Sequence, residues 1–244
     1  MAAVAAPATP MSPATPWARA GWALASLATA LLILVATMIP FFSPLWIDGE
    51  QDRAGSAGLT GYSPSDVRAA TDSIVHDLLF GGDFDVVVGD SRVLDQAEAS
   101  HMRDVRGVFA GLAILGIASF AGLALLARRL GGQASGATRA AAWAAVGRGA
   151  AWLATLLVVL GVVAVVAFDA AFELFHQLLF PGGNFDFDPR TEKLVQLFPI
   201  QFWSDTALAY GAVAIAVSLL VAWLARRRRA VAPGPAATVP GIGP

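Results

Sequence analysis

The chain has 244 residues, of which 57% are hydrophobic and only 14% are charged. This composition excludes an ordinary soluble domain and indicates a membrane protein. A formal net charge of −2 gives no basis for nucleic-acid binding, and the absence of cysteine excludes both a disulfide between loops and a cysteine nucleophile.

Four apolar stretches are each long enough to cross a hydrocarbon core of about 30 Å as a helix. None contains a charged residue, and they cover about 20–39, 107–127, 150–168 and 206–225. We therefore expect an all-α membrane protein with a four-helix transmembrane domain over 17–225. It is preceded by a tail over 1–16 that we expect to be disordered and followed by a basic, then Pro/Gly-rich tail over 226–244.

The distribution of charge predicts how the spans are oriented. All 18 acidic residues lie either between Asp48 and Asp104 or between Asp169 and Asp205. In two other segments the only charged residues are basic. Arg128, Arg129, Arg139 and Arg148 lie between spans two and three, and Arg226 to Arg229 follow span four. The positive-inside rule then places both termini in the cytoplasm, with the acidic segments as two outer loops over about 41–104 and 172–203.

The first outer loop is too long for a bare connection, so we expect it to be structured. Its Ser-Pro-Ser-Asp sequence at 63–66 is typical of a helix start, and apolar positions over 67–78 continue it as an amphipathic helix on the membrane surface or under the loop. Residues 84–88 predict a short strand that ends at a Gly-Asp turn at 89–90.

The second outer loop begins with an apolar stripe at helical spacing that includes His176. The helix should end at Pro181, where an aromatic, carboxylate-rich turn over 184–189 begins. An imidazole next to a rigid turn at the end of two spans suits acid–base chemistry. The alternative is a loop that caps the bundle, with His176 merely hydrogen-bonded.

A short segment after His76 is similar to the segment after His176, at a separation of 100 residues. Both read His-x-Leu-Leu-Phe, and each follows an odd-numbered span. One interpretation is a two-fold internal repeat about an axis along the membrane normal. The other is a chance match between short apolar segments.

All three histidines, His76, His101 and His176, fall on the outer side. The outer ends of a four-helix bundle converge, so His101 and His176 can meet at the bilayer surface. Asp104 follows His101 by three residues and Glu173 precedes His176 by three, a spacing at which a carboxylate can orient an imidazole. For His76 we expect an interfacial packing role.

Other chemistries have weaker support in the sequence. Three histidines with nearby carboxylates can form a zinc site, but there is no HExxH motif and no close histidine pair, so we expect no metal and no cofactor. Ser100 lies beside His101, but nothing resembles the GxSxG motif of a serine hydrolase. A non-catalytic assembly factor fits the hydropathy equally well, and it would retain function without His101 or His176.

Two motifs stand out in the outer loops. They are Glu98-x-x-His101-Met102-x-Asp104-Val105-Arg106 and Phe175-His176-x-x-x-Phe180, the latter followed by Phe187-Asp188-Pro189 and Leu197-x-Pro199-x-x-Phe202. Together they resemble a family of four-span bacterial integral membrane proteins, the lipoprotein intramolecular transacylases. The similarity covers roughly 22–225, and the start of the helix at Tyr62-Ser63-Pro64 also fits.

The resemblance implies an activity at the bacterial cell membrane, among membrane lipids. The family acts on lipid-anchored lipoproteins whose N-terminal cysteine carries a diacylglyceryl thioether. It moves the sn-2 acyl chain from the glyceryl oxygen to the α-amino group of that cysteine, which gives a lyso-form lipoprotein. A different acyltransferase or hydrolase, or a non-catalytic membrane interaction protein, is the alternative.

The resemblance also implies that His101 and His176 are the catalytic pair. We expect His176 to act as base and His101 as acid or oxyanion stabiliser, and the exchanged assignment is also compatible. Amine and ester belong to one substrate, so positioning supplies much of the rate. As supporting residues we expect Asp104, Arg106, Glu173, Asn184 and Asp188.

Overall fold

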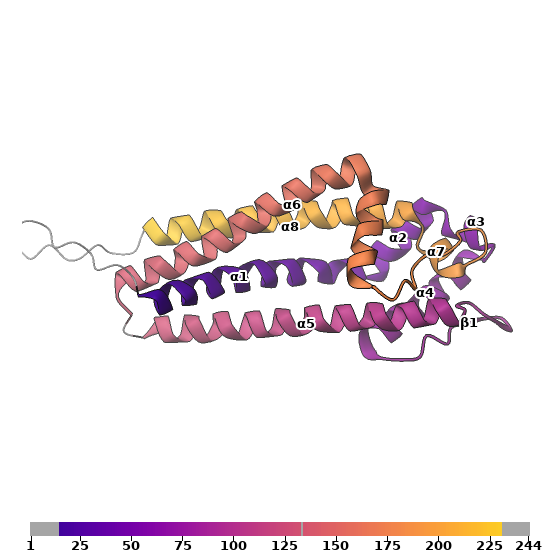
Figure 1. Ribbon diagram of the computed structural model, residues 1–244, viewed down its shortest axis with the longest axis horizontal. Coiled ribbons are helices and arrows are strands. Elements are labelled where there is room, and N and C mark those ends of the chain that lie inside the picture. Colours follow the sequence, from indigo (N-terminus) through magenta and orange to yellow (C-terminus); the bar gives the residue numbers. More distant parts are fainter. Residues whose placement is uncertain (1–14, 133, 231–244) are drawn as a thin grey trace, which may run out of the picture.

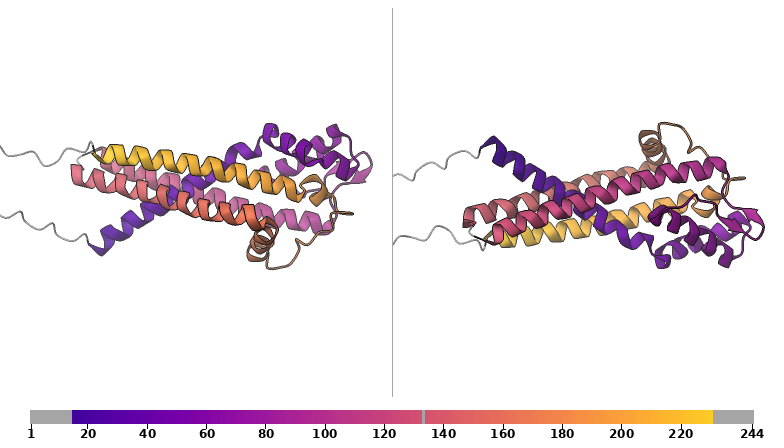
Figure 2. Two further views of the ribbon diagram at one scale, coloured as in Figure 1. Left: turned by 90° about the horizontal axis from the view of Figure 1, so that it is seen from above. Right: turned by 90° about the horizontal axis from the view of Figure 1, so that it is seen from below.

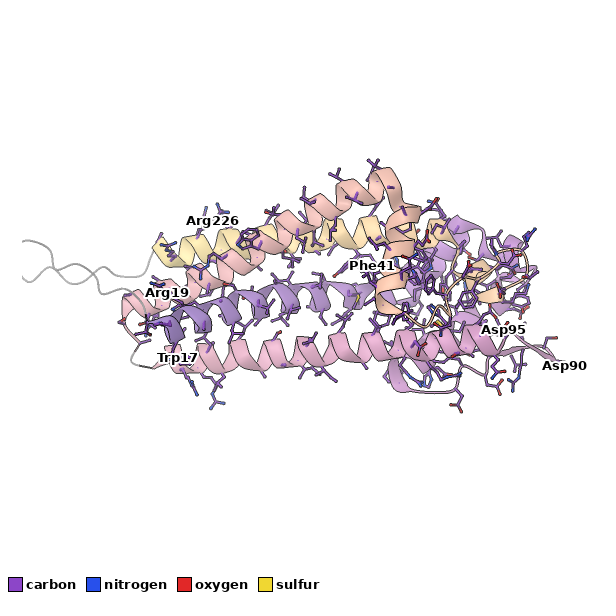
Figure 3. The ribbon with its side chains drawn as sticks, viewed as in Figure 1. Trp17, Arg19, Phe41, Asp90, Asp95 and Arg226 are labelled. Atoms are coloured by element: carbon purple, nitrogen blue, oxygen red, sulfur yellow. The ribbon has the colours of Figure 1, made fainter. Side chains whose placement is uncertain are left out.

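The computed structural model describes residues 15–132 and 134–230, so nearly all of the expected N-terminal tail and most of the C-terminal tail lie outside the described residues. Long helices form a rod that carries a cap of shorter elements at one end (Figure 1). Both ends of the described chain lie at the opposite end of the rod. Arg19 and Arg226 mark that end, and Asp90 and Asp95 mark the cap (Figure 3).

Within the described residues, four helices are long and apolar enough to cross a membrane, which confirms the predicted all-α, four-span class. They are α1 (Pro16–Met38, continued by the 3-10 helix η1, Ile39–Phe42), α5 (Gln96–Gly131), α6 (Gly136–Leu179) and α8 (Ile200–Ala230). At 1.5 Å per residue α5 is about 54 Å long, nearly twice the thickness of a hydrocarbon core. Its charged first turns, Gln96 to Arg106, therefore protrude, and its spanning part is the uncharged stretch 107–127.

The connection between spans two and three is much shorter than expected. Helix α6 begins at Gly136, so Arg139 and Arg148 lie on a helix rather than in a loop over 128–148. Alanine dominates this region and has the highest helix propensity. Ser135 caps the start, because its side chain accepts a hydrogen bond from the backbone N–H of Thr138 at 3.2 Å.

Small residues let the membrane helices approach one another closely. Helix α1 crosses the other long helices at an angle (Figure 2). At the crossing with α6, a Cβ added to Gly149 would lie 2.0 Å from the backbone oxygen of Ser26. The Ser26 hydroxyl donates to the carbonyl of Ala145 at 2.9 Å. Close backbone contact of this kind is the usual way to join helices in lipid, where burial of apolar surface supplies no driving force.

The cap is built from the two segments that the charge pattern predicts as outer loops, called the outer segments below. It contains α2 (Pro44–Ala54), α3 (Ser56–Thr60), α4 (Pro64–Phe80), the hairpin of β1 (Val87–Val88) and β2 (Ser91–Arg92), and α7 (Lys193–Leu197). The predicted helix start is confirmed, because the Ser63 hydroxyl accepts from the N–H of Asp66 at 3.2 Å. The predicted strand is shorter than expected and pairs across the Gly89-Asp90 turn.

A hydrophobic core of its own holds the cap together, and the apolar face of α4 packs into it rather than onto a membrane surface. Buried polar groups fix the second outer segment to the first. The Gln51 amide donates to the carbonyl of Leu197 at 2.9 Å and to the Thr71 hydroxyl at 2.8 Å. The Ser56 hydroxyl donates to the same carbonyl at 2.9 Å.

The close contact between α1 and α6 makes a testable prediction. Gly149→Ala should force the two backbones apart and destabilise the protein by about 1–3 kcal/mol, as overpacking of a tight interface does. Gly161→Ala is the matched control on the same helix, because a Cβ there meets nothing within 4 Å. Thermal unfolding in detergent should show a lower Tm for the first variant only. Equal Tm values for the two variants would contradict the packing.

Candidate active site

A break in α6 brings the second outer segment toward α5. At Ala167 the backbone leaves the helical region, with φ −148° and ψ 53°, although helix continues on both sides. The part beyond the break, 168–179, turns across the bundle toward α5 (Figure 1). The preceding residues are rich in valine, whose branched side chain is less favourable in helices. The predicted apolar stripe lies on this bent part.

A capping box fixes the start of α5 and with it His101. The Asp95 carboxylate accepts from the N–H of Glu98 at 2.8 Å, and the Glu98 carboxylate accepts from the N–H of Asp95 at 2.7 Å. The other oxygen of Glu98 accepts from the N–H of Leu194, on α7, at 2.7 Å. Burial raises the pKa of the Glu98 carboxyl, and the two backbone N–H groups counteract this by stabilising its charged form.

The structure brings His101 and His176 together, as the sequence predicted. Their rings are stacked, with centroids 5.8 Å apart and planes at 28°. His101 is buried and His176 is half-buried. Phenylalanine rings surround the pair: Phe180 and Phe187 lie 4.8 and 5.5 Å from His101, and Phe172, Phe175 and Phe185 lie 4.2, 5.3 and 5.4 Å from His176.

Hydrogen bonding sets the orientation of each imidazole. Nδ1 of His176 lies 2.8 Å from the carbonyl oxygen of Phe172, so Nδ1 carries the proton and donates it, which leaves Nε2 free. The Asn184 amide nitrogen donates to the Asp104 carboxylate at 2.7 Å. Among the described residues, two buried atoms beside this bond lack a conventional partner: Nδ1 of His101 and Oδ1 of Asn184.

The two imidazoles have different electrostatic surroundings. Burial, together with the neighbouring His176, lowers the pKa of His101 to about 4. Asp104 and the nearby side chain of Asn184 act in the opposite direction but do not balance it. His101 lies on the protruding part of α5, outside the hydrocarbon core, and it is neutral at physiological pH.

Two of the expected supporting residues lie at the site, Asp104 and Asn184. Glu173 does not orient His176, because its carboxylate accepts from the side chain of Gln177 at 3.0 Å while the carbonyl of Phe172 holds the ring. At 3.6 residues per turn, the i−4 carbonyl lies directly below the imidazole and is the nearer acceptor.

Arg106 and Asp188 serve the loops instead of the imidazoles. Arg106 donates to the backbone carbonyl of Gly82 and stacks over Phe84, 5.3 Å from the ring centroid, which clamps the first outer segment. Asp188 forms an ion pair with Arg190 at 2.7 Å within its own turn. Hydrogen bonds from Arg190 hold the pKa of Asp188 below its usual range.

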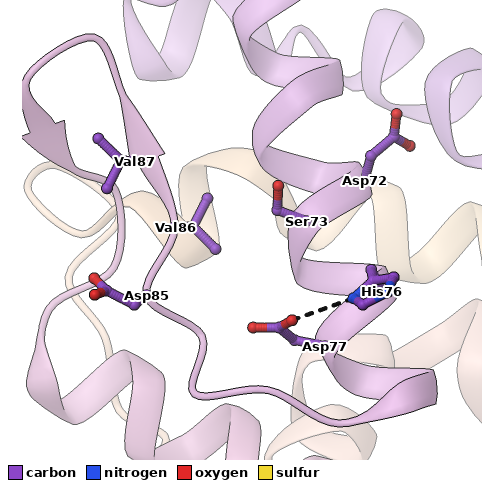
Figure 4. A pocket seen from close by; sticks show the side chains of 7 residues that line it. All are labelled: Asp72, Ser73, His76, Asp77, Asp85, Val86 and Val87. Carbon is purple, nitrogen blue, oxygen red and sulfur yellow. Dashed lines mark hydrogen bonds and ion pairs between the residues drawn. The ribbon is translucent and has the colours of Figure 1, made fainter.

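His76 lies apart from the other two histidines. Its side chain is 66% exposed rather than packed at an interface, and its Nδ1 lies 3.4 Å from the Asp77 carboxylate. An open pocket of about 520 Å³ surrounds it, lined by Asp72, Ser73, His76, Asp77, Asp85, Val86 and Val87 (Figure 4). The two His-x-Leu-Leu-Phe segments therefore have different surroundings.

Neither this pocket nor the histidine pair provides a metal site. Within 15–132 and 134–230, no group of three or more His, Asp or Glu side chains is placed to hold a metal ion. The zinc alternative therefore has no ligand set in the described part of the chain.

A second pocket of about 510 Å³ adjoins the histidine pair. It is lined by Arg103, Asp104, Gly107 and Val108 of α5 and by Leu179, Phe180, Pro181, Gly182 and Asn184. Phe180 and Asn184 thus border both the pocket and His101. The pocket thus lies next to the pair, at the point where α5 passes from charged to uncharged sequence.

The expected site residues did not include Phe172 or Phe180, although Phe180 is part of the motif that carries the family resemblance. Both are four residues from His176, one before and one after, so helical spacing places them beside its ring. That spacing is readable in the sequence, but an aromatic residue there equally predicts core packing.

Fold and site define an all-helical integral membrane protein with two apposed imidazoles at the cap end of its spans. The family model of the lipoprotein intramolecular transacylase Lit matches residues 22–203, most of the chain, and the chain belongs to this family. It is accordingly an enzyme of the lipoprotein intramolecular transacylase class.

Solved structures of similar fold come from Bacillus cereus. The integral membrane transacylase Lit of that organism matches with a TM-score of 0.73 and 18% identity, over 86% of this chain and 94% of that chain. Two variants of the same protein, each with one histidine replaced, match with a TM-score of 0.68 over 86% of this chain. The arginine variant is 17% identical and 91% of it is covered, and the alanine variant is 18% identical and 92% of it is covered. No curated protein sequence matches the chain.

The lowered pKa of His101 predicts a pH dependence of stability. A histidine in an unfolded chain has a pKa near 6.5, whereas His101 in the folded protein has a pKa of about 4. As pH falls below 6.5, the unfolded chain therefore binds a proton at this residue before the folded protein does. The contribution of the neutral His101 imidazole to the free energy of unfolding is thus fully present above pH 6.5 and is lost as pH falls toward 4. His101→Gln should flatten this dependence in thermal unfolding, whereas His76→Gln, at an exposed ring, should not. An unchanged slope in His101→Gln would refute the prediction.

Proposed function

We propose that this chain catalyses an intramolecular O-to-N acyl shift on diacylglyceryl lipoproteins at the outer face of a bacterial cell membrane. The sn-2 acyl chain leaves the glyceryl oxygen and is attached to the α-amino group of the N-terminal cysteine. Membership of the transacylase family supports the reaction. The observation that carries the mechanism is the 5.8 Å apposition of His101 and His176 beside an open pocket.

The unequal surroundings of the two rings favour the exchanged assignment of roles, with His101 as base and His176 as acid. Oδ1 of Asn184 can only accept, so it suits a proton on Nδ1 of His101 and leaves Nε2 as the acceptor. Its low pKa keeps His101 neutral, so that its Nε2 carries no proton at physiological pH. The reaction then requires His176 to act as the acid through Nε2, while its Nδ1 donates to the carbonyl of Phe172.

Protons balance over one cycle. Nε2 of His101 accepts a proton from the α-amino nitrogen as that nitrogen bonds to the ester carbonyl carbon. Nε2–H of His176 donates to the glyceryl oxygen as the carbon–oxygen bond breaks. The proton then returns from His101 to His176. No covalent enzyme intermediate is needed, because one substrate carries both nucleophile and ester.

The depth of the pair suits a lipid ester. His101 precedes Gly107, where the uncharged stretch of α5 begins, by six residues, about 9 Å along a helix. Each polar interfacial layer of a bilayer is roughly 5 to 8 Å thick. By this measure the backbone of His101 lies at the water-facing edge of the headgroup layer, within a side chain's length of that layer, and the substrate's glyceryl esters would have to reach the imidazoles there.

In the proposed orientation the cap lies at the outer face of the membrane and both termini lie in the cytoplasm. The chain has no cysteine, so single cysteines report accessibility without background. Asp90→Cys, at the exposed hairpin turn, should react with a membrane-impermeant thiol reagent in intact spheroplasts. Ala230→Cys, at the exposed end of α8, should react only after lysis. Labelling of both in intact spheroplasts would show that the orientation is wrong.

The roles of the histidines predict the effect of their removal. His101→Ala and His176→Ala should each lower N-acylation by on the order of a hundred- to ten-thousand-fold, because each removes a proton-transfer group. His76→Ala is the control, since its exposed ring lies apart from the pair. Mass spectrometry of a lipoprotein N-terminal peptide measures the product. Normal N-acylation by both variants at equal protein levels would rule out the mechanism and favour a non-catalytic role.

A further inference from the structure

The bent part of α6, residues 168–179, has two chemically different faces. Asp169, Glu173 and Gln177 recur at one-turn spacing, and Gln177 donates to Glu173 at 3.0 Å along this polar face. The opposite side is apolar and open. Its members keep much of their surface exposed: Leu174 54%, Phe175 50%, Leu178 72% and Leu179 40%. In the described structure this exposed face has no protein partner that covers it.

Its place in the chain identifies what covers this face. The segment follows the candidate span Gly136–Val163 of the same helix, and Val165 and Val166, between that span and the break, are 71% and 80% exposed. Twelve residues of helix reach only about 18 Å, too short to cross a hydrocarbon core of about 30 Å. The segment therefore lies along the membrane surface.

Contact with the start of the α5 span indicates how deep the segment lies in the membrane. Leu179 lines the same pocket as Gly107 and Val108, the first residues of the uncharged span of α5. The apolar face of the segment is thus level with the outer boundary of the hydrocarbon core. A helix with separate polar and apolar faces at that level buries its apolar face among acyl chains and keeps its charges among headgroups.

We propose that residues 168–179 form an interfacial helix whose Leu174, Phe175, Leu178 and Leu179 face binds outer-leaflet lipid and so sets the membrane depth of His176. Its occupant is bilayer lipid, and no partner protein is required. The consequence for catalysis rests on the proposed acyl shift: lipid contact holds the imidazole of His176 level with the substrate's ester. The location of the helix is independent of that reaction.

The position of the helix is testable without activity. Nitroxides attached to Leu178→Cys and, as a matched control, Glu173→Cys would be compared in nanodiscs of phosphatidylcholine and phosphatidylglycerol. The label at 178 should collide more with oxygen than with a water-soluble nickel chelate, and the label at 173 should show the reverse. Equal or greater nickel collision at 178, or thiol cross-linking of Leu178→Cys between two copies, would overturn the proposal.

A second measurement connects depth to reaction. Leu178→Glu should lower N-acylation of a membrane-bound lipoprotein at least tenfold, whereas Gln177→Glu should change it less than twofold. Equal rates for the two variants would overturn the link to catalysis. If Leu178→Glu does not accumulate, the labelling result decides alone. His101→Ala and His176→Ala should leave the collision pattern unchanged, so loss of the acyl shift and misplacement of the helix give different results.

Discussion

The break in α6 at Ala167 is the feature on which the site depends. A straight helix would carry His176 about 14 Å beyond Ala167 along the original axis, away from α5. The bend turns the segment so that its imidazole stacks on His101. Contacts beyond the break offset the free-energy cost of the non-helical residue. The ring of Phe172 lies 6.2 Å from that of Trp203, and Asn184 is hydrogen-bonded to Asp104. The bend and the histidine pair thus stabilise each other.

His101 is held from the opposite side by the cap. The buried carboxylate of Glu98 accepts two backbone hydrogen bonds, one from the start of its own helix and one from Leu194 on α7. A buried charge is tolerated because donors replace the lost water. Gln51 and Ser56 add hydrogen bonds to the carbonyl of Leu197, so the segments on either side of α5 in the sequence are joined to each other. The protruding end of α5 is therefore a rigid support and not a frayed terminus.

The two imidazoles differ in burial. Removing water disfavours the imidazolium, which lowers the pKa of the buried ring of His101 and keeps that ring neutral. Phenylalanine rings on several sides maintain this difference, because they exclude water without supplying a charge. Asn184 links the buried ring to α5, since its side chain lies beside His101 and its amide donates to the carboxylate of Asp104.

The sequence by itself determined the four spans and the Ser63 helix start, and it singled out His101 and His176, whose rings lie side by side in the structure. The spans and the helix start depend on composition, periodicity or a local cap, which are properties of neighbouring residues, whereas the two histidines were singled out by a resemblance of motifs. Tertiary structure alone decided the break at Ala167, the carbonyl that holds His176, and the assignment of Arg106, Glu173 and Asp188 to loop or helix contacts. These depend on which groups from distant segments meet, and a carboxylate or guanidinium pairs with whichever donor or acceptor the fold brings nearest.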